Sequence, residues 1–457
     1  MAIAEMNVFN TLTGKKERFQ PLQDGRVNFF VCGPTVYNYP HLGHAKTYTQ
    51  FDFIVRYLRS LGYDVFYLQN ITDIDDKIIQ RAKERGQEWD QLAREFEAIY
   101  MEDMTALGNN SVTTYARASE FIPEIVSQVD RLLENGVAYT ANDGIYYDLS
   151  LFSDYGKLSG RRELREEDAV SRIDESSEKK NWNDFCLWKA EKPGEPSWDT
   201  DVGKGRPGWH IEDTAITESF FGAQYDAHGG AIDLIFPHHE AEIAQMEAIS
   251  GQVPMVGYWL HTGFLNINAR KMSKSKGEMR TIRETLQFYS GRVLRLFFLS
   301  SHYRSTIDFS DASLEQAKNA LNRIDEFLFR IDPGLDDLET EPAIDQLSKA
   351  VFEALNDDFN APRALAAVFD FIRTENVRGK LGRRVHEFFG KLDDVFGVFQ
   401  TGEQSNNQEI DRLIAERQKL RANKEYEKAD EIRTELLAKG IQLYDTKASV
   451  EWRVIGQ

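Results

Sequence analysis

The sequence predicts an α/β fold in which a nucleotide-binding domain is interrupted by an insertion and followed by a mainly helical C-terminal part. Three observations support this prediction. A strand, a loop, a helix and a second strand follow one another between residues 29 and 68, and apolar strand-like runs return after residue 208. Beyond residue 293 the apolar residues recur with the period of helices. A Rossmann-like domain with an insertion, followed by a helical bundle and a small C-terminal module, is therefore expected.

The first unit begins with a short apolar strand at residues 29–31, which a turn-rich loop ends. From residue 45 to residue 61 the apolar side chains recur every three or four positions, which predicts a helix that stops at Gly62. A second apolar run at residues 65–68 predicts the next strand. The unit therefore has the order of a βαβ crossover, which places the two strands parallel.

Two histidines lie in the first turn of this predicted helix. His41 and His44 are three residues apart, so their side chains point the same way. A helix N-terminus attracts anions, because its free N–H groups and the positive end of its dipole face outward. The pair therefore suggests a triphosphate site, although two histidines that only cap the helix, without a ligand, would give the same pattern.

A lysine-rich loop follows a later apolar run. Residues 271–277 read KMSKSKG, with three lysines in six residues. A solvated surface loop is one interpretation. The order HLGH at 41–44 and then KMSKS at 271–275, however, resembles the paired signatures of the class I aminoacyl-tRNA synthetases.

Further stretches make this resemblance more specific. They are NITDIDDKII at 70–79, PGWHIEDTAI at 207–216, HGGAIDLIFPHHEAEIAQ at 228–245 and CGPTVY at 32–37. Together they resemble the cysteinyl-tRNA synthetases, and the likeness covers nearly the whole chain. The resemblance implies that L-cysteine is activated with ATP and Mg²⁺ to cysteinyl-adenylate and then transferred to the 3′ end of tRNA(Cys). Two alternatives remain: a cysteine-adenylating ligase that uses a small amine, and an inactive synthetase paralogue with a binding role.

The resemblance also implies roles for individual residues. Catalytic roles fall to His41, His44, Lys271 and Lys274. ATP contacts fall to Thr35, His41, Gly43, His44, His228, Gly230, Asp233 and Lys274. Contacts to the substrate cysteine fall to Trp209 and Thr72.

A metal site is expected as well. His238 and Glu242 are four residues apart in a helical pattern, so one ion could bind both. The resemblance implies one zinc per chain, held by Cys32, Asp213, His238 and Glu242. Asp213 stands where the family has a second cysteine. An aspartate can ligate zinc, and an outer-shell or lost role for Asp213 is the alternative. Zinc would separate cysteine from serine because it binds a thiolate strongly.

The expected organisation follows these motifs. Its units are the first half of the Rossmann catalytic domain at 1–110, a connective insertion at 111–205, the second half of the catalytic domain at 206–265, the KMSKS loop and stem-contact region at 266–310, a helical anticodon-binding domain at 311–400 and an RNA-binding module at 401–457. Within them we expect a mobile charged loop at 161–180 and an apolar strand at 232–236. The basic residues of the last module are expected to contact RNA; they are Arg412, Arg417, Lys419, Arg421, Lys424, Lys428 and Arg433.

Composition limits the other possibilities. The 457 residues are enough for about three domains. No run approaches the about 20 apolar residues of a membrane span, and the N-terminus lacks the pattern of a secretory signal. Two cysteines are too few for a disulfide framework. We therefore expect a cytoplasmic monomer that does not bind membranes. Because the net charge is −19, tRNA contacts require a local basic surface.

Overall fold

A computed structural model describes most of the chain. The described residues are 5–161, 176–267, 270–271, 280–376, 381–400, 408–423, 425–438, 441–445 and 450–454. Most of the predicted charged loop at 161–180, and the KMSKS residues after Lys271, lie outside them. Among the helices of this described part, none is long and apolar enough to cross a membrane.

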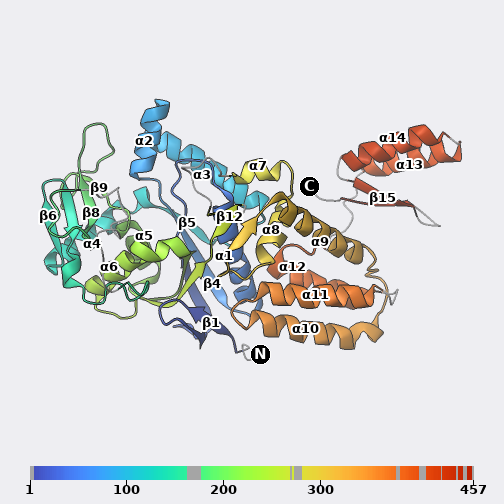
Figure 1. Ribbon diagram of the computed structural model, residues 1–457, viewed down its shortest axis with the longest axis horizontal. Coiled ribbons are helices and arrows are strands. Elements are labelled where there is room, and N and C mark those ends of the chain that lie inside the picture. Colours follow the sequence, from blue (N-terminus) through green and yellow to red (C-terminus); the bar gives the residue numbers. More distant parts are fainter. Residues whose placement is uncertain are drawn as a thin grey trace.

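The centre of the molecule is a parallel sheet of five strands with the order β11-β10-β3-β4-β5 (Figure 1). Its strands are β3 (Arg26–Val31), β4 (Asp64–Ile71), β5 (Thr114–Arg117), β10 (Tyr225–Ala231) and β11 (Val256–Thr262). Every neighbouring pair in this sheet is parallel. From β3 the chain adds β4 on one side, whereas β10 pairs on the other side, so the strand order reverses at β3. In open α/β sheets such a reversal leaves a crevice at the carboxyl ends of the strands, where ligands bind.

Alternate residues of β3 face two different layers. Phe29 and Val31 pack in the hydrophobic core that includes helix α1 (Leu42–Ser60). Phe30 and Cys32 pack in the core on the opposite side of the sheet. That second side carries α5 (Ile211–Phe221) and α6 (Glu240–Ser250), which contact each other. Because side chains alternate along a strand, Cys32 is directed toward α5 and α6 and away from α1.

The strand predicted at 232–236 is wrong. The strand is β10, which ends at Ala231, and the chain then makes a 3-10 turn at Ile232–Leu234 and a π-helical turn at Ile235–His239. The sequence does not predict β10 as a strand because two of its residues are glycines, which have no apolar side chain. Neighbouring aromatic rings occupy the space that larger side chains would need. A Cβ on Gly229 would lie 2.5 Å from the Phe51 ring, and one on Gly230 would lie 2.7 Å from the His239 ring.

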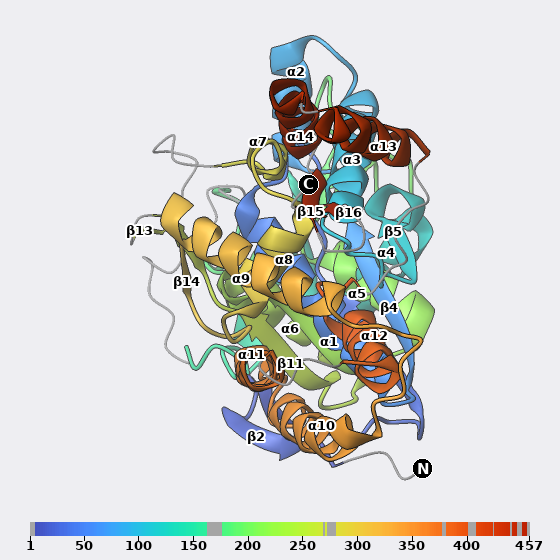
Figure 2. The ribbon, with the colours of Figure 1, turned by 90° about the vertical axis from the view of Figure 1, so that its right-hand side faces the viewer.

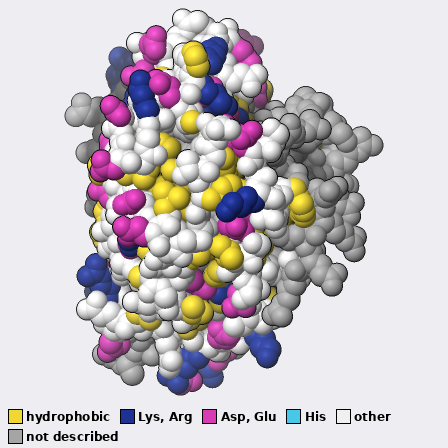
Figure 3. Space-filling view, turned by 90° about the vertical axis from the view of Figure 1, so that its left-hand side faces the viewer, with side chains coloured by type: hydrophobic (Ala, Val, Ile, Leu, Met, Phe, Trp, Pro, Cys, Tyr) yellow, Lys and Arg dark blue, Asp and Glu magenta, His cyan; other side chains and the backbone are white. Residues whose placement is uncertain are grey.

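The insertion forms a second sheet, which is antiparallel and has the order β6-β7-β8-β9. Its elements are α4 (Ile122–Glu134), β6 (Ala138–Ala141), β7 (Gly144–Tyr147), β8 (Phe185–Ala190) and β9 (Gly205–Pro207). They occupy the left of Figure 1 and share a core with α5 and α6. On the face in Figure 3, acidic and basic side chains are intermixed around a central strip of hydrophobic ones. Among the described residues on that face, the basic side chains do not gather into a patch of the kind that binds nucleic-acid phosphates.

The C-terminal part is helical, as the periodicity predicts. It contains α7 (Ile282–Leu286), α8 (Gly291–Leu299), α9 (Asp311–Phe329), α10 (Glu341–Leu355), α11 (Ala361–Glu375) and α12 (Arg383–Phe396). Figure 2 shows α8 and α9 crossing in front of the central sheet, with α10, α11 and α12 below them. The bundle joins the core of α1, where Phe53 and Phe396 have ring centroids 5.1 Å apart. Helix α1 and the bundle therefore share one continuous core.

Further helices and strands lie elsewhere in the described residues. They are β1 (Asn7–Asn10), β2 (Lys15–Arg18), α2 (Asp76–Arg85), α3 (Trp89–Ala106), β12 (Leu265–Ile267), β13 (Arg270–Lys271), β14 (Ile307–Phe309), α13 (Gln408–Ala422), α14 (Tyr426–Ala438), β15 (Ile441–Asp445) and β16 (Val450–Val454). The last module has a small core of its own around Leu436. Arg417 is only 2% exposed there, so the expectation that it contacts RNA is wrong.

Candidate functional site

Four side chains from separate elements meet at the carboxyl end of β3. They are Cys32 after β3, Asp213 in the first turn of α5, His238 in the turn before α6, and Glu242 in α6. One donor atom from each lies within 4.8 Å of the others, and all four residues are buried. His238 Nε2 is 3.0 Å from Asp213 Oδ2 and 3.1 Å from Glu242 Oε1. The structure therefore brings together all four residues of the predicted metal site.

The chemistry of this outer set, Cys32, Asp213, His238 and Glu242, fits a divalent cation. Three of its members can carry negative charge. Burial raises the pKa of the Cys32 thiol, and the Glu242 and Asp213 carboxylates raise it further. Burial and then Asp213 also raise the pKa of Glu242. Glu242 Oε2 is buried and accepts no hydrogen bond from the described residues. A cation would balance these charges, and sulfur, imidazole and carboxylate are donors that zinc accepts.

A further layer of side chains orients the outer set. Asn70, at the end of β4, donates from its amide nitrogen to Asp213 Oδ1 at 2.5 Å and accepts a hydrogen bond from the Gly33 N–H at 2.5 Å. One amide therefore links the residue after Cys32 to the carboxylate on α5. His210 Nδ1 lies 2.8 Å from His238 Nδ1, on the ring edge away from the carboxylates. Partners of this kind fix the orientation of metal ligands.

The predicted substrate residues lie beside this cluster. The Trp209 ring stacks on His238 with centroids 4.4 Å apart and planes at 15°. Trp209 is half-buried, and the Lys77 ammonium lies 6.0 Å from its ring. The Thr72 hydroxyl donates to the Glu212 carboxylate next to Asp213, and the Thr72 backbone bridges to Thr35. Trp209 is thus the more exposed neighbour of the cluster, whereas Thr72 is 2% exposed.

The two signature histidines form a reciprocal cap at the start of α1. His41 Nδ1 accepts the His44 N–H at 3.3 Å, and His44 Nδ1 accepts the His41 N–H at 3.4 Å. Their rings are stacked, with centroids 3.8 Å apart. Because each Nδ1 is an acceptor, the neutral ring carries its proton on Nε2. Both residues therefore present N–H donors at a helix N-terminus, and capping and ligand binding are compatible.

The other predicted nucleotide residues divide between two places. Asp233 lies close enough to His41 for its charge to oppose the fall in the pKa of His41. His228 lies elsewhere: its imidazole is fully buried, with Nε2 3.3 Å from Cys32 Sγ. Gly230 faces the His239 ring. The structure thus places His228 against Cys32, and the Cβ position of Gly230 against the His239 ring. Residues on a central strand alternate between faces, and the sequence does not show which face meets the nucleotide.

The start of α1 also contacts segments before and after the lysine-rich loop. The Leu42 N–H donates to the Arg280 carbonyl at 3.2 Å, and the Ile282 N–H donates to the Pro40 carbonyl at 3.1 Å. At the other end, the buried Lys46 ammonium donates to the carbonyls of Gly263 and Ser305, next to β12 and β14. Lys271 lies in β13, which pairs with β12, and Lys274 lies outside the described residues. The described segments on either side of KMSKS therefore lie next to the start of α1.

The buried histidines predict how stability depends on pH. Burial lowers the pKa of His41 from 6.5 to about 4 and that of His261 to about 3. Between each of these values and 6.5 the unfolded chain binds a proton that the folded chain does not, so the free energy of unfolding rises with pH. We expect the stability contributed by His41 to be complete above pH 6.5 and to fall as the pH drops toward 4.

Urea unfolding at pH 7.5, 6.0 and 5.0 measures this effect. The matched variant is His41→Asn, because asparagine is a good N-cap residue that does not titrate. Its unfolding midpoint should fall less than that of the native chain between pH 7.5 and 5.0. Equal falls in the two proteins would contradict the lowered pKa of His41.

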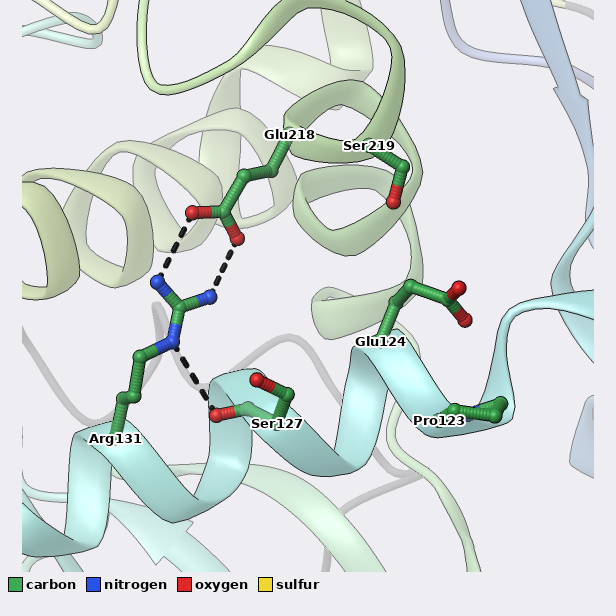
Figure 4. A pocket seen from close by; sticks show the side chains of 6 residues that line it. All are labelled: Pro123, Glu124, Ser127, Arg131, Glu218 and Ser219. Atoms are coloured by element: carbon green, nitrogen blue, oxygen red, sulfur yellow. Dashed lines mark hydrogen bonds and ion pairs between the residues drawn. The ribbon is translucent and has the colours of Figure 1, made fainter.

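A separate pocket lies between α4 and α5. Its volume is about 330 Å³, and it is lined by Pro123, Glu124, Ser127, Arg131, Glu218 and Ser219 (Figure 4). Arg131 donates to both Glu218 oxygens, at 3.0 and 2.5 Å, so these two charged groups of the pocket pair with each other. Glu218 follows Asp213 by five residues on α5, which turns it toward a different face of the helix. None of the predicted site residues lines this pocket.

Comparison with known proteins identifies the family. The family model described as "tRNA synthetases class I (C) catalytic domain" matches residues 18–319, the DALR domain matches 350–400, and the "Cysteinyl-tRNA ligase anticodon binding domain" matches 406–453. A cysteine–tRNA ligase of Thermococcus gammatolerans is 44% identical over 476 residues, covering 98% of this chain and 99% of the relative. The chain belongs to the cysteine–tRNA ligase family.

Other relatives of the cysteine–tRNA ligase family match over similar lengths. The cysteine–tRNA ligase of Geobacter metallireducens is 44% identical over 484 residues, covering 98% of this chain and 99% of the relative. Solved class I synthetases share the fold. Methionyl-tRNA synthetase of Mycobacterium tuberculosis has a TM-score of 0.58 at 16% identity, covering 82% of this chain and 88% of its own. The leucyl enzyme of Agrobacterium radiobacter has a TM-score of 0.62 at 11% identity, covering 85% and 86%.

Several residues at the site were missed by the sequence analysis. Asn70, His210, Glu212 and His239 all lie within stretches that carry the family resemblance, but no role was assigned to them. A signal was present for His239, which follows His238 directly and is likewise a potential ligand. Little in the sequence indicated a role for Asn70, because asparagine is common where a strand passes into a turn. Only the paired strands β3 and β4 bring Asn70 beside Gly33.

Proposed function

We propose that this chain charges tRNA(Cys) with cysteine. In the first step the cysteine carboxylate attacks the α-phosphorus of ATP, an oxygen–phosphorus bond forms, and pyrophosphate leaves. In the second step the cysteinyl group passes from the adenylate to the 3′ end of the tRNA, and AMP leaves. The observation that carries this proposal is the buried outer set at the point where the strand order reverses. The two histidines that cap α1 lie on the next element after β3.

His41 and His44 would bind the triphosphate through their Nε2–H groups. Burial keeps both rings neutral at pH 7, since it lowers the pKa of His41 to about 4 and also lowers that of His44. Neutral donors that are already oriented cost little reorganisation when charge develops in the transition state. Thr35, Gly43 and Asp233 are proposed to contact ATP, which brings Mg²⁺. Lys271 and Lys274 would neutralise the departing pyrophosphate.

The outer set would hold zinc, and Trp209 and Thr72 would border the bound cysteine. Zinc, when bound there, supplies a ligand position that a thiolate fills and a serine hydroxyl fills poorly. Asp213 replaces the family's thiolate with an oxygen donor of the same charge. The Asn70 amide donates a hydrogen bond to Asp213 Oδ1. The other oxygen, Oδ2, faces His238 and would be the atom that ligates zinc.

The acceptor is proposed to be tRNA and not a small amine. The matches to a DALR domain and to an anticodon-binding domain support this choice, because a small-amine ligase has no use for these modules. The intact HLGH cap supports an active enzyme over a binding paralogue.

The test is ATP–pyrophosphate exchange with cysteine or serine, together with zinc analysis of the same sample and charging of tRNA(Cys). We expect exchange with cysteine and little with serine, about one zinc per chain, and cysteinylated tRNA. A folded protein that binds ATP but supports no cysteine-dependent exchange would overturn the proposal. Exchange without tRNA charging would replace tRNA with another acceptor.

A further inference from the structure

A second set of metal donors lies next to the outer set and shares two residues with it. This inner set consists of Cys32, His228, His239 and Glu242. Cys32 Sγ lies 3.3 Å from His228 Nε2, 3.2 Å from His239 Nε2 and 3.9 Å from Glu242 Oε1. In a tetrahedral zinc site, Zn–S of about 2.3 Å and Zn–N of about 2.0–2.1 Å place sulfur and nitrogen about 3.5 Å apart. Cys32 and the two histidine nitrogens therefore already have nearly the sulfur–nitrogen spacing that zinc requires.

In both histidines of the inner set, the Nδ1 atom has a hydrogen-bonding partner. His239 Nδ1 is 2.8 Å from His261 Nε2, and His261 Nδ1 is 2.8 Å from Thr11 Oγ1. His228 Nδ1 is 2.7 Å from the Tyr225 hydroxyl. When these Nδ1–H groups donate to His261 and Tyr225, both Nε2 lone pairs converge on Cys32. His228 Nδ1 also lies 3.5 Å from Glu242 Oε2. Imidazoles that ligate a metal are held in this way, with the second nitrogen bonded to a neighbouring group.

Donor type distinguishes the two sets. The inner set offers a sulfur, two imidazole nitrogens and one carboxylate oxygen, whereas Asp213 gives the outer set a second oxygen donor and leaves it one nitrogen. Every residue of both sets is at most 5% exposed. Cys32, Glu242 and Asp213 belong to the same buried cluster in both positions, so the donor atoms and not the net charge separate the two positions.

Access distinguishes them too. His228 stacks on Trp259 at 4.2 Å and meets the edge of Phe30, so the inner side is closed by packed rings. His238 in the outer set stacks on the half-buried Trp209. A thiol that enters past Trp209 therefore meets the outer set first.

We propose that the inner set is a second position for the divalent cation, in which the ion rests until a thiol binds. This inference rests on the proposed function, because it concerns the same ion and the same substrate. Cys32 and Glu242 remain ligands in both positions, so the move exchanges His228 and His239 for His238 and Asp213. The ion at rest is thus held away from the entrance.

Zinc K-edge X-ray absorption of the full chain counts sulfur and imidazole ligands directly. Without cysteine we expect one sulfur and two imidazoles in the native chain; with cysteine we expect two sulfurs and one imidazole. Asp213→Asn should keep zinc with two imidazoles and should not gain the second sulfur. His239→Gln should lose the two-imidazole signal and bind zinc at least 10- to 100-fold more weakly without cysteine, since even outer partners of ligands cost that much.

One imidazole in the native chain without cysteine, unchanged in His239→Gln, would overturn the inner position, and so would loss of zinc in Asp213→Asn. Circular dichroism shows whether each variant is folded, and the Asp213→Asn arm tests the proposal even if His239→Gln does not fold. Exchange measured on the native sample separates the two proposals. Cysteine-dependent exchange with a one-imidazole site rejects the inner position alone, whereas absence of exchange rejects the proposed function and this inference with it.

Discussion

Replacing His44 with glutamine is expected to lower the rate of cysteine-dependent ATP–pyrophosphate exchange by about 100- to 1,000-fold, because removing one oriented donor to developing charge costs about 2.7–4 kcal/mol. The substitution removes the His44 Nε2–H. It keeps the cap, since glutamine at this third helical position also accepts a hydrogen bond from the N-cap N–H. His44 now makes that contact through Nδ1 at 3.4 Å. The loss should therefore appear in the rate and not in the stability.

The measurements are the exchange kinetics and the urea unfolding midpoint of the same samples. His41→Asn is the companion variant, because it removes the other donor and retains a favourable N-cap. If the two rings act together on the triphosphate, the double variant should lose less than the product of the two single losses. An exchange rate within threefold of native in His44→Gln would show that the ring only caps the helix.

Replacing Asp52 with alanine is expected to lower the free energy of unfolding by about 3–5 kcal/mol, because it leaves a buried charge without its partner. Arg295 is 1% exposed and donates to Asp52 Oδ2 at 2.5 Å and to Asn109 at 2.9 Å. Burial by itself would raise the pKa of Asp52, yet Arg295 and Arg56 hold it below its usual value. Arg295 also donates to the Phe396 carbonyl, so the network joins α1, α8 and α12.

Urea unfolding of four proteins tests this network: the native chain, Asp52→Ala, Arg295→Met and the double variant. Methionine preserves much of the arginine volume without its charge. The double variant should be more stable than Asp52→Ala, since the unpaired charge is then gone. Strict additivity of the two single losses, or a loss below about 1 kcal/mol in Asp52→Ala, would contradict a buried and coupled pair. Native exchange activity per folded molecule in Asp52→Ala would place the effect on stability alone.

The first βαβ unit could be predicted from local sequence alone. Apolar residues at a helical period are buried together whatever lies beyond them, and α1 ends within two residues of the predicted stop. The strand at β10 could not be predicted in this way. Gly229 and Gly230 belong there because the Phe51 ring on α1 and the His239 ring in the turn after β10 fill the space above them.

The candidate site likewise contains residues that sequence motifs identify and contacts that only the fold creates. Sequence resemblance selected Cys32, Asp213, His238 and Glu242, because each lies in a recognisable stretch. It placed His228 with the nucleotide, whereas the strand order puts His228 against Cys32. The helical period and the motifs are properties of single segments, so the periodic helices, the family resemblance and the candidate donors could be predicted from the sequence alone. Which donors share one buried volume depends on the pairing of β3 with β10 and on the face that each residue presents. The contact of Asn70 with Asp213, and the sharing of Cys32 by two donor sets, follow from that packing and are not visible in the sequence.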